Sequence, residues 1–63
     1  MFAIIGVRNG AHYVRSVHWS LRNAIRRAID DVGAAVILRG ETFEAGQRID
    51  VLALRRENVV AVK

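Results

Sequence analysis

The sequence predicts a small α+β domain, in which one helix packs on one face of a mostly antiparallel sheet in the order ββαββ. One stretch of apolar residues repeats with the three- and four-residue spacing of a helix. The stretches around it are rich in β-branched residues and are bounded by turn signals, as in strands. Because the 63 residues contain no proline and no polar linker, the whole chain, 1–63, is predicted to form a single α+β domain.

The chain opens with a predicted β-hairpin. Asn9-Gly10 is a pair that two-residue hairpin turns prefer, and β-branched and aromatic residues lie on both sides of it. Strands are therefore expected over about 2–8 and 11–17. The alternative extends the following helix backwards over residues 11–19, where several apolar residues fall on its apolar face. The β-branched and aromatic content of this stretch favours the strand.

A helix is predicted from about Leu21 to Val32. Its apolar side consists of Leu21, Ala24, Ile25, Ala28, Ile29 and Val32. This spacing gives one buried stripe, with charged residues on the opposite side. Ser20 is suited to cap the first turn, and Gly33 stands where glycine commonly closes a helix.

The strands after the helix are predicted from apolar runs and alternation. Residues 34–38 are apolar on both faces, as in a central strand covered on both sides. A turn near residues 44–47 leads to a strand from about Arg48 to Leu54, where apolar and polar residues alternate. A polar turn at 56–58 then precedes a final strand, Val59–Val62.

The final strand is the predicted contact between copies of the chain. An edge strand exposes unpaired N–H and C=O groups, so Val59, Val60 and Val62 form the expected oligomer edge. A domain of this size buries little surface, and the absence of cysteine rules out disulfides. Hydrophobic residues make up 52% of the chain, which is a large share for so small a domain. We therefore expect part of this apolar surface to be buried in a homo-oligomer, most simply a dimer.

Positive charge is concentrated in the first 27 residues. The net charge is +4, and these residues include five arginines but no acidic residue. A one-sided basic segment is typical of a protein that binds phosphates or an acidic partner. The alternative is that the arginines only keep the domain soluble.

The predicted binding surface mixes arginine with aromatic residues, a combination that suits phosphates and nucleobases. Its members are Tyr13, Arg15, Trp19, Arg22, Arg26 and Arg27. Arg22 in the first helical turn and Asp30 and Asp31 in the last oppose the helix dipole, each at up to ~1 kcal/mol. A role other than helix stability would explain these positions. The alternative for Trp19 is a place in the core or in a hydrophobic staple before the cap.

No catalytic site, metal site or cofactor is predicted. The candidate nucleophiles and bases are Ser16, Ser20, His12 and His18, and their spacing builds no triad. On one strand the two histidines would lie roughly 20 Å apart, too far to share a metal ion.

These patterns predict a small, basic, non-enzymatic module that binds nucleic acid through an arginine-rich helix face. The alternative is a protein-binding inhibitor or adaptor, for example of mobile-element or phage type, that docks on an acidic partner surface or by edge-strand pairing. The longest apolar run is far too short to span a bilayer, and the N-terminus lacks the pattern of a signal peptide. A cytoplasmic location without membrane partners is therefore expected.

Overall fold

The computed structural model describes residues 1–50, 54–55 and 57–62, which form one helix and a five-stranded sheet. The elements are β1 (Phe2–Arg8), β2 (Ala11–His18), α1 (Leu21–Ile29), β3 (Ala34–Arg39), β4 (Arg48–Ile49) and β5 (Val59–Val62). The α+β class is confirmed. The predicted ββαββ order is one strand short, because three strands follow the helix. The strand expected over Arg48–Leu54 begins at Arg48, but residues 51–53 of it lie outside the described residues.

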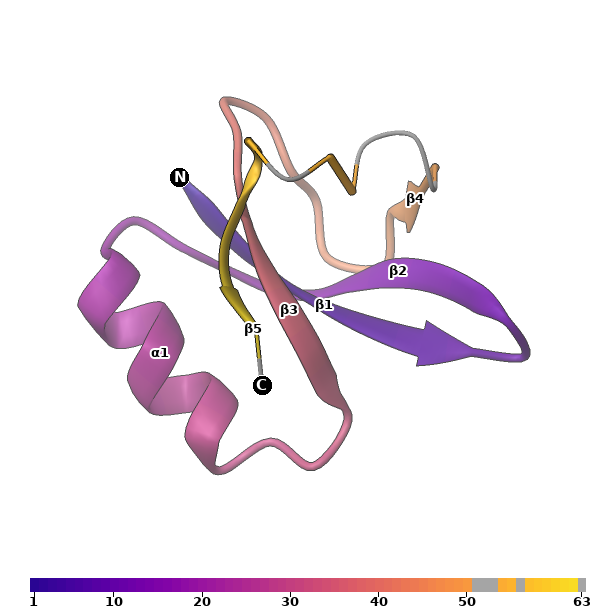
Figure 1. Ribbon diagram of the computed structural model, residues 1–63, viewed down its shortest axis with the longest axis horizontal. Helices are drawn as coiled ribbons and strands as arrows, with labels where there is room; N and C mark the ends of the chain where they lie inside the picture. Colours follow the sequence, from indigo (N-terminus) through magenta and orange to yellow (C-terminus); the bar gives the residue numbers. More distant parts are fainter. Residues whose placement is uncertain (51–53, 56, 63) are drawn as a thin grey trace.

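The sheet has the order β4-β2-β1-β3-β5, and each of its strand pairs is antiparallel (Figure 1). β1 takes the central place because its hairpin partner β2 lies on one side and β3 returns on the other after the helix. β4 and β5 are the two edge strands of the described sheet, so Val59–Val62 lies at an edge as predicted.

The turn between β1 and β2 confirms the predicted hairpin. Asn9 and Gly10 have φ angles of 51° and 78°. Two successive positive φ values match the type I′ turn, whose twist fits the right-handed twist of the paired strands. Residues 11–18 are therefore strand, and the alternative of a helix that begins near residue 11 is wrong.

The sheet buries side chains on both faces. On the face that α1 covers, Ile4 and Ile37 pack against Ala24 and Ala28. The opposite face holds a second cluster, consisting of Ala3, Ile5, Val14, Leu38 and Ile49. Phe43 and Leu54, from the segment after β3, pack against that cluster and cover it. The expectation that the strand after the helix is covered on both sides is confirmed, since Ile37 and Leu38 are buried on opposite faces.

The helix begins where the sequence predicts and ends earlier. The Ser20 side chain accepts a hydrogen bond from the Asn23 N–H, as an N-cap does. The last helical residue is Ile29, followed by Asp30 as the C-cap, so the prediction that α1 continues to Val32 and closes at Gly33 is wrong. Val32 is fully exposed, and the Gly33 N–H donates to the Asp31 side chain instead of capping the helix. None of the helical segments in the described ranges is long and apolar enough to cross a membrane.

Candidate binding surface around the start of the helix

Trp19 stands at the surface between the end of β2 and the start of α1. Its side chain is 83% exposed, so the alternative that places it in the core is wrong. Leaving so large an apolar ring in water forgoes the burial free energy that a tryptophan usually supplies to a small core. The chain has no other tryptophan. An exposed ring at this position is therefore available for a ligand or partner.

Three of the predicted arginines lie on the exposed side of α1, the helix that begins two residues after Trp19. Arg22, Arg26 and Arg27 are exposed, and within the described residues none of them forms an ion pair or hydrogen bond through its guanidinium. Arg22 and Arg26 lie one turn apart, so their side chains are neighbours on the helix surface. Trp19 and these three arginines together form the Trp–Arg surface.

The shorter helix changes the dipole argument for these charges. Arg26 and Arg27 stand in the last turn of α1, where the dipole favours cations. Arg22 in the first turn remains opposed to the dipole, and so does Asp30 at the C-cap. Helix stability thus accounts for two of the arginines, and only Arg22 still needs another explanation.

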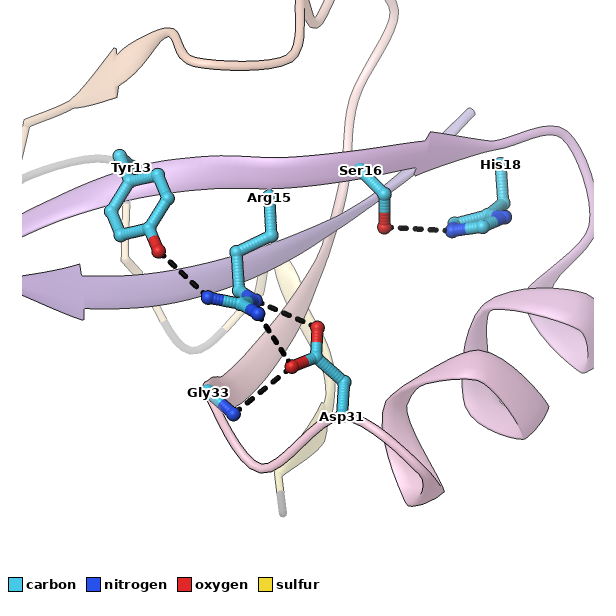
Figure 2. A network of polar contacts seen from close by, with 6 residues as sticks. All are labelled: Tyr13, Arg15, Ser16, His18, Asp31 and Gly33. Carbon is cyan, nitrogen blue, oxygen red and sulfur yellow. Dashed lines mark hydrogen bonds and ion pairs between the residues drawn. The ribbon is translucent and has the colours of Figure 1, made fainter.

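Arg15 lies at the surface, but its guanidinium is fully engaged in hydrogen bonds within the domain. Its Nε and Nη2 donate to the two carboxylate oxygens of Asp31, each at 2.7 Å, and its Nη1 donates to the Tyr13 hydroxyl at 2.7 Å (Figure 2). The same carboxylate accepts the Gly33 N–H at 3.0 Å. This bidentate pair ties β2 to the turn between α1 and β3. Arg15 and Tyr13 are therefore not brought into the Trp–Arg surface.

The charge state of Arg15 follows from these contacts. The hydrogen bond to Asp31, and next the one to Tyr13, raise the pKa of the Arg15 guanidinium above its ordinary value. A raised pKa stabilises the fold at every pH below the ordinary value, and the contribution is lost only as the pH rises through the folded-state pKa. The Arg15 guanidinium therefore keeps its positive charge at every pH at which the protein would normally be studied.

Two glycines make room for the Arg15 side chain. A methyl group on Gly6 would lie 2.7 Å from Arg15 Cδ and 2.8 Å from the carbonyl oxygen of Gly33. A methyl group on Gly33 would collide with the Arg15 guanidinium. Asp31, Gly6 and Gly33 were not among the predicted site residues. The signal for Gly6 was present, because a glycine inside a strand often marks a close approach of other atoms.

Ser16 and His18 form a hydrogen-bonded pair on β2, with 2.9 Å between Ser16 Oγ and His18 Nε2 (Figure 2). They are two residues apart, so they share one face of the strand. A catalytic serine also needs a third group that orients its base. Among the described residues no carboxylate is hydrogen-bonded to His18, and none of them form a group of three or more metal-ligating side chains. Within the described ranges, this pair is a local polar contact.

No family model, curated protein or solved structure matches this chain. Its candidate surface consequently rests on its own geometry. That geometry separates the six predicted residues into two groups. Trp19, Arg22, Arg26 and Arg27 are exposed, and the three arginines have no partner within the described residues, whereas the exposed guanidinium of Arg15 donates to both Tyr13 and Asp31.

Proposed function

We propose that this chain is a non-enzymatic module that binds nucleic acid through the Trp–Arg surface. The observation that carries the proposal is the 83% exposure of Trp19 just before a helix whose exposed arginines have no partner within the described residues. A tryptophan ring stacks on any base, because every base has a π-face. Guanidinium groups bind phosphate in bidentate fashion without reading sequence. Together they support binding that depends little on sequence.

Single-stranded nucleic acid is the expected form of the ligand. A ring that stands at the protein surface stacks on a base only where that base has left its own stack. The exposed bases of a single strand meet this condition, whereas duplex DNA offers mainly its phosphates to this surface. Arg22, Arg26 and Arg27 would follow the backbone of the strand while Trp19 stacks on one base.

The first test is a titration of Trp19 fluorescence with a single-stranded oligonucleotide of mixed sequence and with the duplex of the same sequence. Saturable quenching is expected with the single strand, with weaker binding as salt rises, because phosphate contacts release counterions. The duplex should bind less tightly at every salt concentration. A silent titration, together with unchanged anisotropy of a labelled oligonucleotide, would contradict the proposal.

Trp19→Ala is expected to weaken single-strand binding by about 5- to 150-fold, since base stacking on an aromatic ring contributes ~1–3 kcal/mol. The thermal unfolding midpoint should change little, because the ring is exposed. Trp19→Phe is the matched control, since it keeps a smaller stacking ring. Anisotropy titrations with a labelled oligonucleotide measure all three proteins. Equal affinity of the parent protein and Trp19→Ala would remove Trp19 from the contact.

A further inference from the structure

An apolar groove lies on the helix-covered side of the sheet, between α1 and the edge formed by β3 and β5. Its walls include Ile25, Ile29, Ala35, Val36, Ala61 and Val62, and its volume is about 130 Å³. Ile29 is 68% exposed and Val62 is 75% exposed. α1 turns its buried stripe towards Ile4 and Ile37 and leaves the side chain of Ile29 uncovered. Val62 pairs with Val36, which packs on the opposite face of the sheet, so Val62 borders the groove at the strand edge and does not point towards α1.

The size of the groove limits what it can hold. An apolar cavity of about 150 Å³ in an engineered protein stays dry and binds benzene. A groove of about 130 Å³ therefore accommodates one phenyl ring or one branched aliphatic side chain. A single such side chain from a partner would contact both the helix and the strands that form the walls.

The strand beside the groove offers a backbone as well. β5 (Val59–Val62) pairs with β3 on one side and is an edge strand of the described sheet on the other. An extended segment can add to such an edge through main-chain hydrogen bonds. In an added strand every second residue points towards the helix-covered side, ~6.8 Å apart. One of these residues would reach the groove.

The rim of the groove on the helix is basic. Arg22 and Arg26 precede Ile25 and Ile29 by three residues each, the spacing that makes side chains neighbours on a helix surface. Both arginines are exposed. Acidic side chains next to the apolar anchor of a partner would meet opposite charge here, whereas basic ones would be repelled.

We propose that this groove and the β5 edge bind an extended segment of a partner protein as an added strand. The segment places one phenylalanine, leucine or isoleucine in the groove, and acidic residues two positions away on the same face lie near Arg22 and Arg26. The inference does not depend on nucleic-acid binding, although the two ligands would compete for these arginines. Trp19 has no part in it.

A second copy of the chain is the other candidate partner for the same edge, because Val59, Val60 and Val62 are the contact that the sequence predicts between copies. Two copies joined at β5 would each bring a basic helix flank to the junction, where like charges repel. An acidic segment neutralises that flank instead. Charge thus favours the foreign segment over self-pairing.

The probe is a labelled, blocked heptapeptide with phenylalanine at its centre and glutamate two residues to either side. Valine and threonine occupy the alternate positions. We expect saturable binding in anisotropy titrations, a loss of about tenfold or more with Ile29→Asp, and no change with Val32→Asp. Val32 is fully exposed and does not line the groove, so it is the matched control. Thermal melts of both variants establish that they are folded.

Changes in the peptide test the same contacts without altering the fold. Methylation of the backbone nitrogens that face β5 should abolish binding, and replacement of both glutamates by glutamine should weaken it. Absence of binding, or binding that survives Ile29→Asp or N-methylation, would overturn the proposal. A parent dimer that Ile29→Asp converts to a monomer in sedimentation would also overturn it, because the groove would then hold a second copy.

The peptide and oligonucleotide assays separate the two proposals. Trp19→Ala should leave peptide binding unchanged. Ile29→Asp places a carboxylate beside Arg26 and should weaken the binding of both ligands, so Ile29→Ser, which removes the apolar wall without adding a charge, is the variant that should leave oligonucleotide binding unchanged. A loss of peptide binding with Trp19→Ala would overturn the groove as the contact site. Failure of the oligonucleotide titration alone leaves these expectations for the peptide intact.

Discussion

Replacing Arg22, Arg26 and Arg27 together with glutamine is expected to remove most of the salt dependence of oligonucleotide binding. For single strands, each phosphate contact contributes ~0.7 to the slope of log K against log salt, so three contacts contribute about 2. That slope corresponds to a roughly 20-fold loss of affinity between ~50 and ~200 mM salt. The triple variant should show a nearly flat salt dependence in anisotropy titrations. Its binding at low salt should be weaker than that of the parent for every sequence.

Arg15→Gln provides the matched control for a single-charge variant such as Arg26→Gln. Both variants lower the net charge equally, but the Arg15 guanidinium is held by Asp31 and Tyr13. Arg26→Gln should reduce the salt slope by ~0.7 without lowering the unfolding midpoint. Arg15→Gln should lower the unfolding midpoint and leave the slope unchanged. If both variants reduced the slope equally, binding would follow net charge, and the Trp–Arg surface would not be the contact.

The local features of the fold were predictable because they depend on residues close in sequence. Asn9-Gly10 indicates the hairpin, since few other residues adopt two successive positive φ angles. Ser20 indicates the first turn of α1 because its side chain caps a backbone N–H three residues away. In both cases the residues that determine the local structure lie within four positions of one another. A short sequence pattern is therefore enough to identify them.

The end of the helix was not predictable from local pattern. The apolar repeat continues to Val32, and Gly33 resembles a helix-closing glycine. In the structure, Asp31 leaves the helix and binds Arg15, which lies 16 residues earlier in the chain. This contact depends on how β2 and the turn after α1 meet, and no periodicity encodes it. The same contact engages the guanidinium of Arg15 and the hydroxyl of Tyr13 within the domain.

Exposure of Trp19 is the part of the candidate surface that sequence reasoning left open. A tryptophan before a cap residue is compatible with a core position and with a surface position. Which one applies depends on how far α1 extends over the sheet. In this fold small residues of α1, Ala24 and Ala28, pack on Ile4 and Ile37 and fill that space. The core therefore forms without the tryptophan.

Gly6→Ala is expected to be the most damaging small substitution in the sheet. An alanine in a strand would ordinarily be favoured by ~0.4–1 kcal/mol, because it restricts the unfolded chain. At Gly6 the new methyl group meets the Gly33 carbonyl at 2.8 Å and the Arg15 stem at 2.7 Å. Overpacking of this kind costs ~1–3 kcal/mol. A domain of this length has a total free energy of unfolding of only ~3–9 kcal/mol, so urea denaturation should show a clear loss.

A double-mutant cycle with Arg15→Ala identifies which neighbour causes the loss. If the Arg15 stem is the obstacle, Gly6→Ala should cost much less when Arg15 is already alanine, since a truncated side chain leaves the space open. If the Gly33 carbonyl is the obstacle, the cost should be the same in both backgrounds, because backbone does not move as readily as the end of a side chain. If the Gly6→Ala variant had the same urea midpoint as the parent protein, that result would contradict the close packing of β1 beneath Arg15. Strong coupling would instead make Gly6, Arg15 and Asp31 one structural unit that joins β1, β2 and the turn after α1.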